Sequence, residues 1–202
     1  MSEVLIGGTE KREIVIVDHD PCWAAKFDHH AARISQALGS KALIIEHVGS
    51  TSVPGLAAKP IIDIDVLVAD SADEAAYLDA LVAAGYVLRV REPDWHEHRM
   101  LRTPELDVHI HVFTIGCVEH TRHALLRDWL RTHAADRQLY ESVKRRLAQQ
   151  DWPDMNAYAN AKSAVVEEIL TRAAPGISMQ KTSGTAFTPP APPHPSSSRA
   201  IP

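Results

Sequence analysis

The sequence predicts one α/β domain in which a sheet-forming half precedes a helical half. Two observations carry this prediction. Short apolar runs rich in β-branched residues recur up to residue 114, interrupted by two helical patterns, and beyond Gly116 the apolar residues recur at helical spacings. Because the later strands follow one another without helices between them, the sheet is not doubly wound throughout. The predicted class is therefore α/β, of the α+β type in which strands and helices occupy separate parts of the chain.

The first expected elements are a short extended run and a long helix. Residues 14–17 are apolar and β-branched, which predicts an edge strand or an extended lead-in. Asp20 and Pro21 predict a helix start, because aspartate caps helices and proline favours the first helical position. Apolar residues at spacings of three and four then give this helix one core-facing side. They are Trp23, Phe27, Ala31, Ile34 and Leu38, and Gly39 ends the helix.

The sheet is expected from five apolar runs. Residues 43–48 predict a strand, and residues 61–68 predict a central one because they are strongly β-branched. A loop of small residues separates the two. A helix over residues 72–84, closed by Gly85, precedes three more strands, of which the last two form a hairpin around Pro104 and Glu105. These three strands cover residues 86–91, 95–102 and 106–114.

Three helices are expected in the second half. Leu125, Leu126, Trp129 and Leu130 mark the first helix, and Leu139, Val143 and Leu147 mark the second. Asp154 caps the third, which contains Tyr158, Val165 and Ile169. The folded domain is expected over residues 12–173. Residues 1–11 are expected to be a flexible N-terminus, and residues 174–202, rich in proline and serine, a disordered tail.

Composition narrows the class of protein. The chain has 202 residues, 45% of them apolar, which suffices for one core. A net charge of -5 does not favour nucleic acid as a partner, and no apolar run is long enough to span a membrane. The start of the chain lacks the pattern of a signal peptide. Two distant cysteines indicate a reduced, cytoplasmic protein, and the sequence says nothing of the oligomeric state.

Two carboxylates on the central strand are the first candidates for chemistry. Asp63 and Asp65 stand two residues apart, so both side chains leave the same face of the sheet. Because two neighbouring carboxylates repel each other, a divalent cation such as Mg²⁺ is expected between them. Upstream, Gly49 and Ser50 end a strand where backbone N–H groups and a hydroxyl can meet a phosphate. The alternative is a solvated sheet face above an ordinary turn.

The segment that holds these residues resembles a known family. Residues 46–66 read EHVGSTSVPGLAAKPIIDIDV, which is similar to the defining motif of the GrpB family within the nucleotidyltransferase superfamily. The resemblance extends over nearly the whole folded unit. It implies a nucleotidyltransferase-like mixed β-sheet with flanking helices and a C-terminal helical segment. It also implies that Gly49, Ser50 and Thr51 hold a nucleotide's phosphates, and that Asp63 and Asp65 bind metal.

The third carboxylate that such enzymes use is not obvious in this sequence. On the matching strand, Asp107, His109 and His111 are expected to share one face. Asp107 is a candidate third metal ligand, although it stands at the start of the strand. His109 and His111 are candidates for the general base, since histidine titrates near neutral pH. They could instead only hydrogen-bond the carboxylates, contact phosphate, or pack.

Four histidines form a separate metal hypothesis. His96, His98, His109 and His111 occur as two His-x-His pairs on strands expected to be adjacent. Convergent imidazoles would favour zinc, iron or nickel over Mg²⁺. A two-residue turn at Pro104-Glu105 would place His98 opposite His111, and a shift by one residue would separate them onto opposite faces.

Lysines of the second half are candidates for phosphate contact. Tyr140 and Lys144, like Tyr158 and Lys162, stand four residues apart and therefore share one helical face. The alternative is an ordinary amphipathic surface with solvated lysines. Lys59 and Arg99 are further cationic candidates.

The leading hypothesis is a Mg²⁺-dependent nucleotidyltransferase. It would move a nucleoside monophosphate from a nucleoside triphosphate to a small-molecule acceptor, with pyrophosphate leaving. The second hypothesis is a nucleotide-binding module of the same fold that does no chemistry and assists or regulates a partner. The third is a histidine-rich transition-metal protein.

Overall fold

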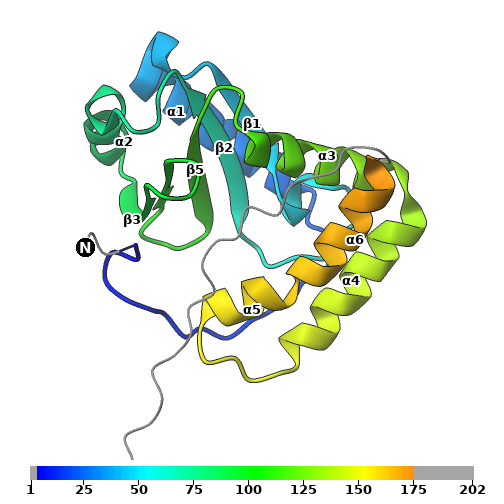
Figure 1. Cartoon of the computed structure of the whole chain (residues 1–202). Coiled ribbons are helices and arrows are strands. Elements are labelled where there is room, and N and C mark those ends of the chain that lie inside the picture. Colours follow the sequence, from blue (N-terminus) through cyan, green and yellow to red (C-terminus); the bar gives the residue numbers. More distant parts are fainter. Residues whose placement is uncertain (1–3, 175–202) are drawn as a thin grey trace, which may run out of the picture.

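Figure 1 shows the computed structural model, which describes residues 4–174. Five strands form one sheet in the order β1-β2-β5-β4-β3. β2 and β5 run parallel, and the other neighbouring strands run antiparallel. The sheet is therefore mixed, and the α+β class predicted from the sequence is confirmed. The strands are β1 (Ile44–Val48), β2 (Ile62–Val68), β3 (Val87–Glu92), β4 (His98–Arg102) and β5 (Val108–Thr114).

One face of the sheet is apolar and forms the main core. Ile62, Ile64 and Val66 of β2 are fully buried, because side chains alternate along a strand and these three leave on the same side. They pack with Val108, Ile110 and Val112 of β5 and with Trp23, Ile34 and Leu38 of α1 (Cys22–Leu38). The opposite face carries the polar residues of the same two strands.

The first helix follows the prediction. The carboxylate of Asp20 accepts a hydrogen bond from the Cys22 N–H at 2.8 Å, which satisfies one of the free donors of the first turn. Gly39 ends the helix with a φ of 55°.

A second core lies under the helical half. The helices are α3 (Val118–Thr132), α4 (Ala134–Ala148), α5 (Met155–Ala161) and α6 (Ser163–Ala173), and Figure 1 shows α4, α5 and α6 gathered away from β3. Val53 and Leu56 pack against Leu130, Val165 and Ile169. The loop between β1 and β2 is therefore anchored on the helices, which fixes the turn that follows β1.

Two expected helices are interrupted. Residues 72–84 do not form one helix but a 3₁₀ turn at Glu74–Ala76 followed by α2 (Leu78–Ala83). The break falls at Tyr77, which has a non-helical φ of -141°, a buried side chain and a hydroxyl that donates to the Ser71 carbonyl at 2.7 Å. The third helix of the second half is likewise split into α5 and α6 at Lys162. Asp154 caps α5 as predicted, accepting from the Ala157 N–H at 2.9 Å.

The expected strand over residues 95–102 is shorter than predicted. β4 begins at His98, because His96 and Glu97 have φ values of 55° and 49° and belong to the turn after β3. The run at residues 14–17 forms no strand and joins the structure through a single bridge between Val17 and Ala58.

The start of the chain lies along the edge of the sheet. Residues 4–11, expected to be a flexible terminus, contact β3: the Ile6 N–H donates to the Arg89 carbonyl at 2.9 Å, and the Arg91 N–H donates to the Val4 carbonyl at 3.0 Å. The expected disordered tail lies outside the described residues beyond position 174. No helix within residues 4–174 is long and apolar enough to cross a membrane.

Candidate functional site

A cavity of about 470 Å³ brings together most of the predicted site residues. Its walls come from the polar face of β2 and β5, the turn after β1, the first residues of the chain, and α4 and α5. The predicted site residues on its walls are Gly49, Ser50, Thr51, Lys59, Asp63, His109, His111, Lys144 and Lys162. Asp65 and Asp107 do not line it.

Gly49 lets the chain pass directly over Asp63. In the antiparallel pair of β1 and β2, Val48 stands opposite Asp63, so the next residue turns above the carboxylate. Gly49 has a φ of 68° and a ψ of -173°, a conformation that is almost restricted to glycine. A Cβ at this position would lie 2.5 Å from Oδ2 of Asp63. Gly49 therefore sets the close approach between turn and carboxylate.

The serine-rich turn, Ser50–Ser52, is held by its own hydroxyls. The Thr51 hydroxyl donates to the Ile61 carbonyl at 3.1 Å and also contacts Nε2 of His47 at 3.0 Å. The Ser52 hydroxyl donates to the Gly49 carbonyl at 2.6 Å. Two of the three hydroxyls are thus engaged within the protein. The Ser50 hydroxyl has no hydrogen bond to a described residue and remains able to meet a ligand.

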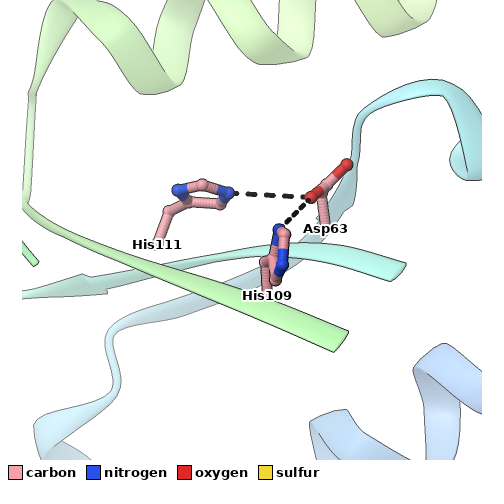
Figure 2. A group of neighbouring side chains, drawn as sticks. All are labelled: Asp63, His109 and His111. Carbon is pink, nitrogen blue, oxygen red and sulfur yellow. Dashed lines mark ion pairs between the residues drawn. The ribbon is translucent and has the colours of Figure 1, made fainter. Parts of the chain in front are cut away.

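Asp63, His109 and His111 form the centre of the polar wall (Figure 2). Oδ1 of Asp63 lies 3.5 Å from Nδ1 of His109 and 3.7 Å from Nε2 of His111. The parallel register explains the contact, because Asp63 stands beside His109 and Asp65 beside His111. Burial alone would raise the pKa of the Asp63 carboxyl, but the two imidazoles hold it well below its usual value.

Asp65 is separated from this group by histidines of α3. Its side chain is completely buried, and its oxygens lie 2.9 Å from Nδ1 of His120 and 2.9 Å from Nδ1 of His123. Burial alone would raise the pKa of Asp65, but the bonds to His120 and His123 lower it to about 2. The two histidines stand three residues apart on one helix and therefore share a face. This spacing is visible in the sequence, but it does not indicate that their partner is Asp65 on β2.

The contact between the buried Asp65 and the half-buried His123 predicts a pH optimum of stability. The pKa of Asp65 is lowered in the folded protein. Its contribution to the free energy of unfolding is therefore present above pH 3.8, the ordinary pKa, and is lost as the pH falls toward about 2. Burial tends to lower the pKa of His123, but Asp65 raises it above the ordinary 6.5. The contribution of His123 to the free energy of unfolding is therefore present below pH 6.5 and is lost at higher pH. We expect His123→Gln to reduce the free energy of unfolding most between about pH 4 and 6.5. Urea unfolding across pH checks this, with the exposed His29→Gln as control; a loss that does not change with pH would contradict it.

Asp107 lies outside the cavity. It pairs with Lys26 of α1 and accepts from the Thr103 hydroxyl at 2.6 Å. Asp107 lies just before β5, and the residue before it, Leu106, has a φ of 64°. Burial tends to raise the pKa of Asp107, but Lys26 and Thr103 lower it. The structure thus places this carboxylate in an ion pair at the end of the sheet.

The two His-x-His pairs do not converge as a group of four. β4 pairs with β5 so that Met100, not His98, stands opposite His111, a shift of two residues from the predicted register. A shift by two residues leaves both side chains on the same face of the sheet. His98 therefore still contacts His111, and Nε2 of His98 lies 3.0 Å from Nδ1 of His111. His96 is in the turn and its ring contacts Trp95.

His98 continues the contact to a carboxylate. Its Nδ1 lies 2.7 Å from Oε2 of Glu92, which completes the chain Glu92–His98–His111. Burial lowers the pKa of His98 to about 4, although Glu92 acts in the opposite direction. His98 is therefore neutral at neutral pH.

Three lysines form the cationic wall of the cavity. Nζ of Lys59 lies 5.3 Å and Nζ of Lys162 4.9 Å from the centre of the Tyr158 ring, and Nζ of Lys144 donates to the Ala57 carbonyl at 2.5 Å. Burial and the charge of Lys162 lower the pKa of Lys59 to about 8 and that of Lys144 to about 7. Among the described residues none of the three has a carboxylate partner within ion-pair distance. An anionic ligand would relieve their mutual repulsion.

The remaining cationic candidate is used elsewhere. Arg99 is buried and pairs with Glu74 at 2.5 Å and with Glu97 at 3.2 Å. It does not line the cavity.

A second charged cluster, which the sequence analysis missed, lies at the cavity edge. Glu10 pairs with Arg12 at 3.1 Å, Arg89 at 3.6 Å and Arg102 at 2.7 Å. The hydrogen bond from Arg102 lowers the pKa of Glu10 to about 2. No motif connects these residues in the sequence, because the cluster depends on the first residues folding back onto β3.

The side chains do not fit a Mg²⁺ ion held by a carboxylate pair. Such an ion prefers oxygen ligands, and Asp63 is the one member of the predicted set, Asp63, Asp65 and Asp107, that lines the cavity. In the described part of the chain, the group of side chains able to share a metal ion is Asp63, His109 and His111. It offers one oxygen and two nitrogens.

Several known proteins are similar to this chain. A family model described as GrpB protein matches residues 13–172. A UPF0157 protein of Streptomyces coelicolor is 54% identical over 169 residues, covering 84% of this chain and 89% of that protein. The crystal structure of the conserved protein GrpB from Enterococcus faecalis superposes with a TM-score of 0.70 at 31% identity, over 79% of this chain and 96% of that one.

A more distant likeness concerns the fold alone. The structure of the GLD-2/RNP-8 complex matches with a TM-score of 0.53 at 13% identity, over 87% of this chain and 75% of that one. The likeness shows that the two chains share a fold.

Proposed function

This chain belongs to the GrpB protein family, and from that premise we propose that it is a nucleotidyltransferase that moves a nucleoside monophosphate from a nucleoside triphosphate to a small-molecule acceptor. One observation carries the proposal. The Gly49–Ser50 turn and the Asp63 carboxylate line the same cavity as Lys59, Lys144 and Lys162. A triphosphate is an anion of the size and charge that such a cavity accommodates.

Each wall has a role in this proposal. The Ser50 hydroxyl contacts the phosphates, and the three lysines neutralise their charge. An acceptor hydroxyl forms a bond to the α-phosphorus while the bond from that phosphorus to the bridging oxygen breaks, and pyrophosphate leaves. The acceptor's proton passes to the polar wall that contains Asp63, His109 and His111. The nucleotide enters as its Mg²⁺ complex, with the ion carried by its phosphates.

A second candidate function is favoured by a separate observation. Asp65 is enclosed by His120 and His123, and Asp107 is paired with Lys26, so neither carboxylate faces the cavity. A chain with this arrangement could bind the nucleotide and do no chemistry, as a module that assists or regulates a partner.

Thermal shift with the four nucleoside triphosphates, with and without Mg²⁺, tests nucleotide binding. A ligand that binds the native state raises the melting temperature in proportion to the logarithm of its excess over the dissociation constant. A pyrophosphate-release assay with a panel of acceptors then separates the two candidates. Release supports transfer, whereas binding without release across the panel supports the module.

We expect Lys162→Met to weaken triphosphate binding about tenfold or more, because a charge-assisted hydrogen bond contributes roughly 1.5–3 kcal/mol. The removed ammonium lies over Tyr158, and Met keeps the length of the stem. Calorimetric titration measures the change, and Lys41→Met, an exposed lysine of the turn Gly39–Lys41, is the matched control. Equal affinities for the two variants would remove Lys162 from the proposed site.

A further inference from the structure

We propose that Asp63, His109 and His111 bind a transition-metal ion of the Zn²⁺ or Fe²⁺ class through one carboxylate oxygen and two imidazole nitrogens. This site differs from the Mg²⁺ site expected between Asp63 and Asp65. The proposal goes beyond the transfer reaction and does not depend on it, because it rests on the arrangement of five side chains on neighbouring strands.

The distances between the three side chains suit a shared cation better than hydrogen bonds. Oδ1 of Asp63 lies 3.5 Å from His109 Nδ1 and 3.7 Å from His111 Nε2, beyond the usual hydrogen-bond range. In a tetrahedral site with metal–ligand bonds of about 2.0–2.2 Å, the ligand atoms lie roughly 3.3–3.6 Å apart. The three donor atoms all lie within 4.8 Å of one another. Figure 2 shows one carboxylate oxygen facing both rings.

The hydrogen bonds behind His111 orient its ring. Glu92 can only accept, so Nδ1 of the buried His98 donates to it at 2.7 Å. Nε2 of His98 lies 3.0 Å from Nδ1 of His111. With Nδ1 engaged by His98, His111 turns Nε2 toward Oδ1 of Asp63, where both atoms can share one cation.

This arrangement is typical of a histidine that binds metal. Metal-bound imidazoles generally donate their other N–H to a carboxylate or another acceptor, which orients the ring. His98 and Glu92 do this for His111. His109 has no such support, because its Nε2 is buried without a partner in the described part of the chain. His111 is therefore expected to be the stronger of the two nitrogen ligands.

The donor set and its surroundings decide the class of ion. Imidazole nitrogens suit zinc, iron and related ions, whereas Mg²⁺ requires oxygen ligands. Asp65, which would supply a second carboxylate, is occupied by two histidines of α3. Three protein ligands that line an open cavity leave further positions for a ligand, as in catalytic zinc sites.

Titration of the full-length, untagged chain with Co²⁺, after treatment with a chelator, tests the proposal. Bound Co²⁺ absorbs visible light according to its ligands, so the readout does not depend on any enzymatic activity. We expect about one Co²⁺ per chain, displaced by Zn²⁺ and not by millimolar Mg²⁺. Absence of the absorption, or its loss on addition of Mg²⁺, would overturn the proposal.

Variants locate the site. We expect His111→Ala and Asp63→Asn to abolish the Co²⁺ absorption, and Glu92→Gln to weaken Co²⁺ binding by about 10–100-fold by removing the carboxylate that orients His98. His29→Ala, an exposed histidine away from the cavity, is the control and should bind as the unmodified chain does. Circular dichroism without metal identifies any variant that fails to fold. Folded His111→Ala protein with unchanged Co²⁺ binding would refute the assignment.

The same samples separate this proposal from the proposed function. Lys162→Met should retain Co²⁺ binding and lose nucleotide affinity, since Lys162 is not among the metal-compatible side chains. If nucleotide binding fails while Co²⁺ binding follows the predicted ligands, the metal site stands without the transferase. If Co²⁺ binding fails while nucleotide binding persists, the metal proposal alone is wrong.

Discussion

Asp63→Asn is expected to reduce pyrophosphate release by about 10²–10³-fold while leaving the protein folded. Asparagine has nearly the shape of aspartate but no charge, so the substitution removes the carboxylate that faces His109 and His111 and leaves the packing in place. Initial rates at saturating nucleotide measure the loss. Because the site needs this charge for a cation or for a proton, the effect should fall on kcat more than on nucleotide affinity.

Asp107→Asn is the matched control for this prediction. The sequence made Asp107 a candidate third metal ligand, but the structure places it in an ion pair with Lys26, outside the cavity. We expect the rate of Asp107→Asn to stay within about twofold of the unmodified chain, because this half-buried ion pair lies outside the cavity. Equal losses in the two variants would mean that the cavity described here is not where the reaction occurs.

Gly49→Ala is expected to have the second largest effect, on both stability and nucleotide binding. The backbone at Gly49 has a conformation that costs other residues about 1–3 kcal/mol. The added methyl group would lie 2.5 Å from Oδ2 of Asp63, so the carboxylate or the turn must move. We expect the melting temperature to fall by roughly 2–12 °C, and triphosphate binding and turnover to be lost together.

Gly39→Ala separates the effect of backbone strain from the effect of displacing the Asp63 carboxylate. Gly39 also has a positive φ, of 55°, but a Cβ there would meet nothing within 4 Å. This variant should lose stability to a similar extent and keep its nucleotide affinity and turnover. If Gly49→Ala is destabilised and still binds and turns over normally, the close contact between Gly49 and Asp63 is not part of the site.

Much of the fold could be predicted because its signals are local. The alternation of apolar and polar residues in β2 placed Ile62, Ile64 and Val66 on one face and the aspartates on the other, and the three apolar side chains are buried as expected. The spacing of apolar residues in α1 predicted a helix with one buried side, which was also confirmed. Local signals failed at Tyr77, where the chain leaves the helical conformation and the buried side chain bonds to the Ser71 carbonyl.

The partners of the predicted site residues could not be predicted, because they are distant in the sequence. His120 and His123 contact Asp65 from 55 and 58 residues away in the sequence. This contact distinguishes Asp65 from Asp63, whereas the sequence pattern predicted the same role for both. The link from His111 to His98 depended on strand register, which a turn sequence alone does not determine. The Glu10 cluster required the first residues to lie along β3.

The most direct test of the central claim is a crystal structure with a triphosphate analogue whose α–β bridge resists cleavage. We expect density for the phosphates between the Gly49–Ser50 turn and the lysines 59, 144 and 162, in the cavity that Asp63 also lines. An analogue bound with its phosphates elsewhere on the protein, or a cavity left empty at concentrations that stabilise the protein in solution, would contradict it.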